Sequence, residues 1–217
     1  MPADDALPDD VDPARDGYLT EDDYPPELRR IIADAPPQDE RPPAERLNAW
    51  LRGLVHSHEY GTLADLRRMP APHRRHRAVP VRARLLAAQF APTEDQRVVY
   101  ERVAFLFARF HAGASQPSAA YGNMGDALRK VGTSAGRGPR DPGATRLLDR
   151  LTAAREIPWR HLQHAVERMR AGDTAPPSWA GLVDDLAAWK SREHDVPVAW
   201  ARAFYTPTFT KKNGNPA

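Results

Sequence analysis

The sequence predicts an all-α protein, and three observations support that prediction. Every apolar segment after residue 43 repeats with a period near 3.6 residues, as one face of an α-helix does. The alternating β-branched runs that are typical of strands are missing. The chain has 217 residues, which is enough to bury roughly 70% of its unfolded surface without a disulfide or a metal. We therefore expect a helix bundle, in two small lobes at about 44–112 and 125–205.

The two ends of the chain differ from this body in composition. Residues 1–43 contain nine prolines and show little periodicity, so we expect a largely disordered arm. Residues 1–40 hold three arginines against thirteen acids, a net charge of −10, whereas the remainder has 28 basic and 16 acidic residues, or +12. Residues 206–217 are predicted to form a basic, flexible tail. We expect a cytoplasmic protein with no membrane partner, because no segment approaches the length and apolarity of a signal or a membrane span.

The first half of the body contains three predicted helices. The first starts near Ala44 and ends near Gly61, and a short second helix is stopped by Met69-Pro70. Thr93-Glu-Asp-Gln has the pattern of a capping box and predicts the start of the third. The apolar positions of that third helix are spaced by four, three and four residues: Val99, Val103, Leu106 and Phe110. The residues 112–125 that follow contain Gly, Ser, Pro and Asn and are predicted to be a loop.

The second half continues with the short helix GDALRKVG and the basic loop TSAGRGPRDPG. Asp141-Pro142 suits an N-cap followed by proline at the first helical position. Pro158 and Pro197 mark the starts of two later helices, and the second of these carries Trp200 and Phe204 one turn apart. Between them lies a helix whose apolar side is predicted from residues spaced by three, four and three: Trp179, Leu182, Leu186 and Trp189.

Catalytic patterns are weak, so we expect no enzyme and no cofactor. The absence of cysteine excludes a thiolate nucleophile and thiolate zinc ligands. His161, His164 and Glu167 lie at i, i+3 and i+6 and could share one side of a helix, but a metal site needs further ligands from other elements. His194-Asp195 is interpreted as a helix end. Adjacent side chains point about 100° apart on a helix, so Asp184-Asp185 is expected to pair with arginines instead of sharing a proton.

Two basic segments indicate a polyanion partner. Between residues 65 and 84 there are seven arginines and one acid. A second group lies partly on the glycine-rich loop, whose backbone can approach a phosphate closely. Guanidinium groups form paired hydrogen bonds with phosphate, and the loops have few aromatic residues, so phosphate contact is favoured over base stacking. The candidate nucleic-acid-binding residues are Arg67, Arg68, Arg74, Arg75, Arg77, Arg129, Lys130, Arg137, Arg140 and Arg146.

The order of motifs in the body adds a family resemblance. GTLADLRRM, GNMGDALRKVG, RLLDRLTAAREIPWRHLQHAVERMRAG, SWAGLVDDLAAW and VAWARAFY follow one another between about residues 45 and 205. This series resembles the CasB family, the small subunit of the type I-E CRISPR surveillance complex, Cascade. The resemblance implies two helical lobes and no enzymatic activity. It also implies that two copies stack along a filament of backbone subunits that carries the crRNA.

A CasB-like subunit would stabilise the R-loop, holding the target heteroduplex and the displaced non-target strand with little sequence preference. Arg67 and Arg68 stand inside the first motif and would line the basic groove, together with the loop arginines. The implied partners are the crRNA, target and non-target DNA, the backbone and large subunits, and a second copy of the chain. Two other hypotheses stay open from the sequence: a free-standing α-helical DNA-binding regulator, and a metal-dependent phosphohydrolase that uses His161, His164 or His194-Asp195.

Overall fold

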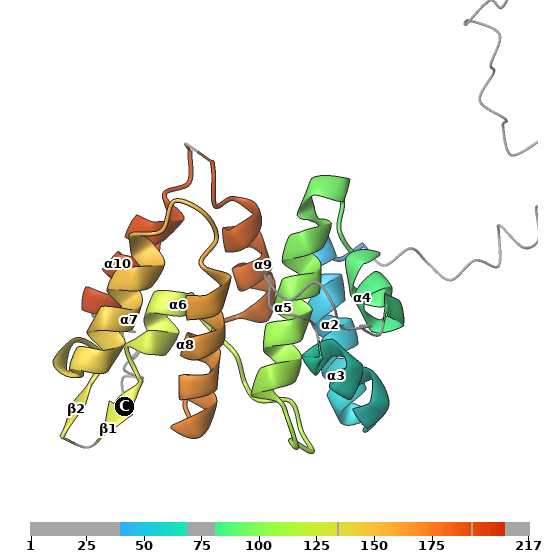
Figure 1. Ribbon diagram of the computed structural model, residues 1–217, viewed down its shortest axis with the longest axis horizontal. Coiled ribbons are helices and arrows are strands. Elements are labelled where there is room, and N and C mark those ends of the chain that lie inside the picture. Colours follow the sequence, from blue (N-terminus) through green and yellow to red (C-terminus); the bar gives the residue numbers. More distant parts are fainter. Residues whose placement is uncertain (1–39, 69–80, 134, 192, 207–217) are drawn as a thin grey trace, which may run out of the picture. The chain divides into compact units, whose positions relative to one another are not determined.

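The computed structural model describes residues 40–68, 81–133, 135–191 and 193–206. Helices dominate these ranges, so the all-α prediction is confirmed (Figure 1). All of the described elements belong to one compact unit that begins at Arg41. Their order is α2 (Pro43–His56), α3 (Tyr60–Arg67), α4 (Val81–Ala88), η2 (Glu94–Gln96), α5 (Arg97–Phe110), α6 (Met124–Leu128), β1 (Gly132–Thr133), β2 (Gly136–Arg137), η3 (Gly138–Arg140), α7 (Pro142–Thr152), α8 (Trp159–Ala171), α9 (Trp179–Ala187) and α10 (Val196–Tyr205).

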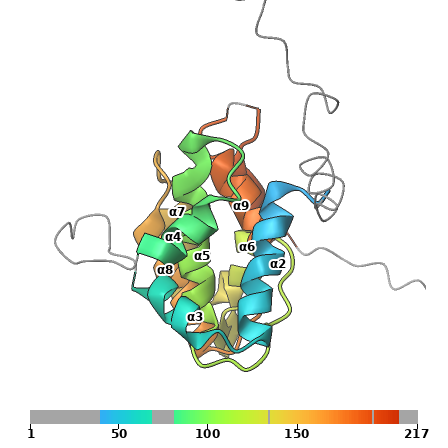
Figure 2. The same ribbon diagram turned by 90° about the vertical axis from the view of Figure 1, so that its right-hand side faces the viewer.

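Helix α5 forms the centre of the packing. It contacts α2, α3 and α4 on one side and α8 and α9 on the other (Figures 1 and 2). Nine of its 14 residues are buried, among them the consecutive run Val103–Ala108. A helix covered on most sides needs apolar residues around most of its circumference, and the sequence RVVYERVAFLFARF supplies them.

Helix α9 joins the two halves of the sequence in one core. It packs against α2 and α5, although it follows them by more than 60 residues. The Trp179 ring lies 5.4 Å from that of Phe107 and 6.0 Å from that of Phe110, both in edge-on geometry. The division into lobes at 44–112 and 125–205 stays a prediction; the buried residues of the described chain form a continuous apolar cluster.

Helices α6, α7, α8 and α10 pack together beyond α9 (Figure 1). Helices α6 and α10 lie very close together, since a Cβ atom on Gly125 would overlap the carbonyl oxygen of Trp200. Trp200 and Phe204 are completely buried, so this side of α10 is part of the core. The Trp200 indole N–H donates to a carboxylate oxygen of Asp185 at 2.6 Å. The expected pairing of Asp184-Asp185 with arginines is wrong, since Asp185 instead satisfies a buried indole and neither carboxylate has an ion pair among the described residues.

The predicted starts of the later helices are confirmed. The Asp141 carboxylate accepts a hydrogen bond from the Ala144 backbone N–H at 2.6 Å, and Pro142 occupies the first turn of α7. Pro158 is the residue before α8. Asp195 caps α10 by accepting from the Val198 N–H at 3.1 Å, so its interpretation as a helix end is also confirmed.

Two boundaries in the first half are wrong. Helix α2 ends at His56, and Gly61 lies in the first turn of α3, because the chain reverses over residues 57–59 and His58 adopts a positive φ of 58°. The side chain of Thr93 makes no capping hydrogen bond, and the chain passes through the 3₁₀ turn η2 before α5 begins. A reciprocal capping box forms at Asn123 and Asp126 instead. The stop at Met69-Pro70, residues 1–39 of the arm predicted at 1–43, and residues 207–217 of the tail predicted at 206–217 lie outside the described residues.

The expectation of no strands is also wrong in one place. Within the predicted basic loop, β1 and β2 form an antiparallel pair with Gly132 opposite Arg137 and Thr133 opposite Gly136. Strands of two residues are too short to show the alternation by which strands are found in a sequence. This hairpin directs the chain into η3 and then α7.

One buried histidine completes the core. His111 is 1% exposed, and its ring stacks on Phe107 with 4.0 Å between centroids. The Ser118 backbone N–H donates to Nε2 at 3.1 Å, so the ring proton must be on Nδ1, which donates to the Phe107 carbonyl at 3.0 Å. Burial is the main reason why the pKa of His111 falls to about 4, and the charge of Arg52 contributes.

This histidine predicts a loss of stability in mild acid. Its folded pKa lies below its unfolded value of about 6.5, so unfolding takes up a proton as the pH falls from about 6.5 to 4. We expect the free energy of unfolding to be about 2 kcal/mol smaller at pH 5 than at pH 7 on account of this residue. Urea denaturation at the two pH values checks this. His111→Gln should remove most of the difference, and a difference that persists in this variant would contradict the assignment.

Candidate nucleic-acid interface

Three arginines from separate helices lie close together: Arg67 of α3, Arg109 of α5 and Arg170 of α8. We call them the arginine cluster. Burial lowers the pKa of Arg67, and the positive charges of Arg170, Arg109 and Arg68 lower it further. Helix α3 packs against α5 and α5 packs against α8, so the three arginines come from neighbouring elements, and this agrees with the influence of their charges on one another. Residues separated by more than 40 positions in the sequence therefore form a single positive patch.

Each member of the arginine cluster lies in the last turn of its helix, where the carbonyl ends favour a cation. Arg109 forms an ion pair with Glu167 on α8. Arg170 donates from Nη2 to the carbonyl oxygen of Ala112, just past the end of α5, at 2.7 Å. These two bonds tie the ends of α5 and α8 together.

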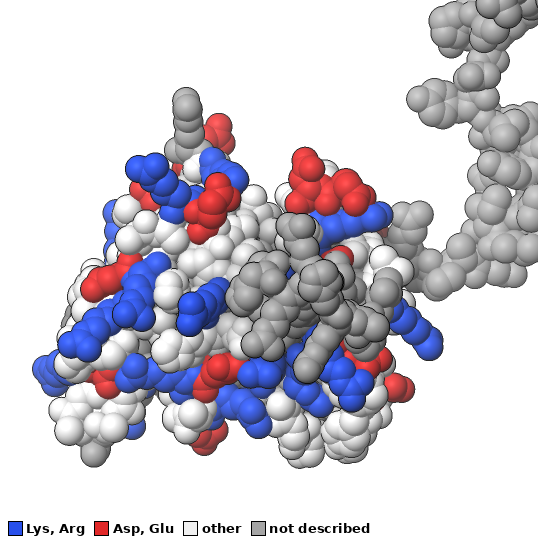
Figure 3. Space-filling model, in the orientation of Figure 1, with Lys and Arg blue, Asp and Glu red and all other residues white. Residues whose placement is uncertain are grey.

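Basic groups continue along α8 and onto α7. Burial lowers the pKa of His161, and the charges of Arg150, Arg160 and His164 add to the shift, so these groups also lie near one another. Arg150, Arg160 and His164 are exposed. Figure 3 shows Lys and Arg side chains in a band across the lower part of this face, with Asp and Glu side chains interspersed among them. The band offers a polyanion several cations from different helices.

A second basic feature surrounds the β1–β2 hairpin, at the opposite end of the described body from α3 (Figures 1 and 2). A hollow with a volume of about 620 Å³ lies there, and we call it the hairpin hollow. It is lined by Arg129, Thr133, Ala135, Gly136, Arg137, Pro139 and Arg140. Three of these seven residues are arginines and none is acidic, so the hairpin hollow favours an anion.

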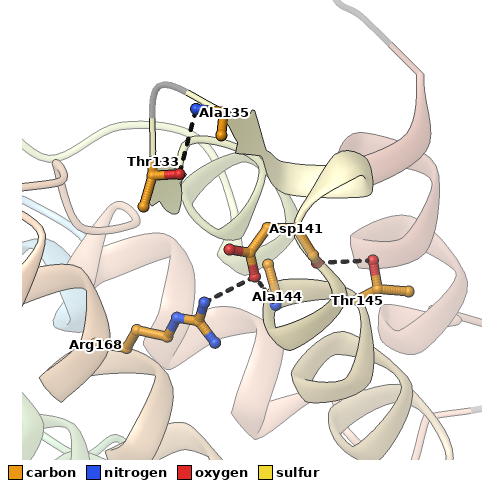
Figure 4. Close-up of polar contacts among 6 residues, drawn as sticks. All are labelled: Thr133, Ala135, Asp141, Ala144, Thr145 and Arg168. Atoms are coloured by element: carbon orange, nitrogen blue, oxygen red, sulfur yellow. Dashed lines mark hydrogen bonds and ion pairs between the residues drawn. The ribbon is translucent and has the colours of Figure 1, made fainter.

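The acidic residue nearest in sequence, Asp141, is engaged elsewhere (Figure 4). Its carboxylate accepts from Ala144 at the start of α7 and pairs with Arg168 of α8 at 2.7 Å. The same close-up shows the Thr133 hydroxyl oxygen accepting from the Ala135 N–H at 3.3 Å, which holds the hairpin turn. Asp141 thus fixes α7 against α8 and does not neutralise the arginines of the hairpin hollow.

The sequence-predicted residues fall into separate groups. Arg67 belongs to the arginine cluster, and Arg68 is a 69% exposed neighbour that pairs with Asp65 at 3.2 Å. Arg129, Arg137 and Arg140 line the hairpin hollow. Lys130 lies over the Tyr121 ring, 3.4 Å from its centroid, and Arg146 is exposed on α7. Arg74, Arg75 and Arg77 lie outside the described residues.

Sequence reasoning missed Arg109 and Arg170. Arg109 stands in an apolar stretch of α5, and Arg170 follows Arg168 by two residues on the polar helix α8, but neither lies in the two basic segments from which the candidates were taken. The available signal was their shared position, since each stands in the last helical turn shortly before a glycine, in ARFHAG and MRAG. That pattern identifies two helix ends, but only the folded chain shows that the ends meet.

The proposed metal ligands are not gathered into a site in the described part of the chain. No group of three His, Asp or Glu side chains there could hold a metal ion. Glu167 is bound by Arg109 and by Gln163, whose amide donates at 3.0 Å. Burial alone would raise the pKa of Glu167, but the hydrogen bonds from Gln163 and Arg109 lower it below the usual value. The Glu167 carboxylate therefore holds Arg109 in place between α5 and α8.

The comparison with protein families bears directly on this surface. The model for CRISPR-associated protein Cse2 matches residues 62–205, a range that contains both the arginine cluster and the hairpin hollow. The chain belongs to the CRISPR-associated Cse2 family. Cse2 is the small subunit of the type I-E Cascade, so the resemblance noted in the sequence is confirmed. This membership implies other Cascade subunits as partners. Comparison with curated proteins and with solved structures gave no match.

None of the helices in the described ranges has the length and apolarity required to cross a membrane.

Variants of Asp141 test how the start of α7 is fixed against α8. Asp141→Ala removes the N-cap of α7 and the partner of Arg168, so we expect the free energy of unfolding to fall by about 1–2 kcal/mol. Asp141→Asn should recover the capping part, because asparagine caps equally well. Asp149→Ala, on an exposed site of the same helix, is the matched control. Urea denaturation of the three variants makes the comparison, and an equal effect of Asp149→Ala would contradict the assigned role.

Proposed function

We propose that this chain is a non-catalytic subunit of a CRISPR RNA-guided surveillance ribonucleoprotein that binds nucleic-acid backbone without sequence preference. In antiviral defence it stabilises the R-loop by contacting the target heteroduplex and the displaced non-target strand. The observation that carries the proposal is the arginine cluster, in which Arg67, Arg109 and Arg170 converge from three helices on one face. Membership of the Cse2 family supports the setting in Cascade.

Phosphate groups are the chemistry that this face fits best. Guanidinium groups at helix ends present forked donors that match phosphate oxygens. Base stacking would need free aromatic faces. Among the described residues the exposed large aromatics are Tyr60, Tyr121 and Tyr205, and one face of Tyr121 is already covered by Lys130. A surface with many cations and few free rings follows a backbone and tolerates any sequence.

The proposed partners follow from this role. They are the crRNA, the target and non-target DNA strands, the backbone and large subunits of the complex, and a second copy of the chain. We assign no catalytic residue, because the carboxylates that face the basic groups already stabilise the fold. Glu167 holds Arg109, and Asp141 holds Arg168 and the start of α7. Cofactors have no part in the proposed role.

The test removes two members of the arginine cluster in the assembled complex. With Arg67→Ala and Arg170→Ala combined, we expect weaker R-loop formation and a smaller salt dependence. The slope of log affinity against log salt should decrease in magnitude by roughly 0.7 for each single-strand phosphate that no longer has its arginine, or about 1.4 for the pair. Titration of a labelled target duplex into reconstituted Cascade at several salt concentrations measures both quantities.

Arg97→Ala is the matched control, since Arg97 is an exposed arginine in the first turn of α5, at the other end from Arg109. It should leave the slope unchanged. Replacing the displaced-strand sequence while preserving guide pairing should also have no effect. An unchanged slope in the double variant, or strong preference for one displaced-strand sequence, would overturn the proposal; the latter would favour the regulator hypothesis.

A further inference from the structure

The hairpin hollow contains a buried cationic donor without a partner. Arg129 follows the last turn of α6, and its Nη1 atom is buried with no hydrogen-bond partner among the described residues. A buried N–H group without an acceptor carries a free-energy penalty, more so on a charged group, and native structures rarely leave one unsatisfied. Because Nη1 is enclosed by the chain, an acceptor from outside reaches it only when the Arg129 side chain moves into the hollow that it lines.

The backbone around Arg129 is held closely. Its N–H donates to the Gly125 carbonyl at 2.9 Å, which anchors it to α6. Gly138 packs against the Arg129 main chain with a positive φ of 55°, and a Cβ atom there would overlap the Arg129 carbonyl. The Gly138 N–H also donates to the Val131 carbonyl at 2.8 Å. Only glycine meets both the steric and the conformational requirement, so position 138 holds the end of the hairpin against the Arg129 backbone.

Two further guanidinium groups complete the site. Arg137 on β2 and Arg140 on η3 are both exposed and line the same hollow as Arg129. None of the three arginines has an ion pair with a carboxylate in the described part of the chain, and Asp141 is held by Arg168 and Ala144. Three neighbouring cations without an internal counter-charge are stabilised by an external anion.

We propose that the hairpin hollow binds an internal phosphodiester group of a nucleic-acid strand, with Arg129 as a fixed anchor and Arg137 and Arg140 closing on the phosphate from the hairpin. This proposal rests on the proposed function for the source of the phosphate, but it concerns a site at the other end of the body from the arginine cluster. A volume of about 620 Å³ is many times that of a single phosphate and admits the attached sugars. Forked guanidinium donors fit two phosphate oxygens, which favours this ligand over an acidic peptide.

The experiment uses the full-length chain, labelled with ¹⁵N, and the dinucleotide dTpdT, which contains one phosphodiester. We expect saturable NMR shifts at the Arg129 side-chain Nε–H and at the backbone N–H groups of Gly136 and Gly138. Inorganic phosphate is the second arm. Binding of dTpdT at least tenfold tighter than inorganic phosphate supports a strand in the hollow, whereas equal affinity, or shifts with phosphate alone, would overturn the phosphodiester assignment.

Matched variants assign the shifts to the hollow. Arg137→Gln combined with Arg140→Gln alters two exposed side chains, so the fold should persist, and we expect the dTpdT affinity to fall at least tenfold. Arg129→Gln should weaken it at least as much. Arg146→Gln, an exposed arginine of α7 that does not line the hollow, should change it less than twofold. A short poly-glutamate peptide that shifts the same resonances more strongly than dTpdT would also contradict the proposal.

The two proposals fail separately. Absence of dTpdT shifts, together with a reduced salt slope for the Arg67 and Arg170 variant in Cascade, would reject the hairpin hollow alone. Saturable dTpdT binding, together with an unchanged slope in that variant, would reject the role of the arginine cluster and leave the hollow as a phosphodiester site.

Discussion

The burial of α5 is the constraint on which the rest of the structure depends. Its side chains are enclosed by helices from both halves of the sequence, so the helix has little freedom to rotate or slide. Phe107 and His111 stack, and Trp179 of α9 packs against their edges. The hydrogen bond from Ser118 to His111 then fixes the loop that leaves α5. Because α5 is fixed, the position of Arg109 is fixed too. Helices α3 and α8 pack against α5 and place Arg67 and Arg170 beside it.

Two carboxylates near the basic residues hold arginines in place between helices. Glu167 binds Arg109 across α5 and α8, and Asp141 binds Arg168 while capping α7. Exposed ion pairs contribute little to stability, but these two are partly buried and link separate helices. Each carboxylate therefore orients a guanidinium. Arg67 and Arg170 have no carboxylate partner among the described residues and keep their full charge available, whereas Glu167 holds Arg109 in position beside them.

Sequence reasoning succeeded where a local signal decides the structure. Asp141 and Asp195 cap helices through hydrogen bonds that span three residues, and Trp200 lies on a plain apolar face, so all three were predictable. The prediction failed at Thr93. The Thr-Glu-Asp-Gln pattern there is typical of a capping box, but the chain forms a 3₁₀ turn and the Thr93 side chain makes no capping hydrogen bond. Sequence reasoning could not find contacts between distant segments: Arg109 meets Arg67 and Arg170 through packing alone, and the partner of Asp185 is an indole 15 residues away.

The hairpin shows how a sequence can indicate a basic, glycine-rich segment without revealing the shape that the segment adopts. The run TSAGRGPRDPG was identified as basic and glycine-rich, and those properties predict phosphate contact in general terms. What creates the hollow is the return of Gly138 onto the Arg129 backbone, a contact between two segments that composition does not reveal. Two cationic features at opposite ends of one body can each bind weakly and still hold a strand well, because the second contact is intramolecular once the first is made. Weak contacts to the backbone also suit a subunit of an RNA-guided complex, in which base pairing reads the sequence and the protein must accept any strand.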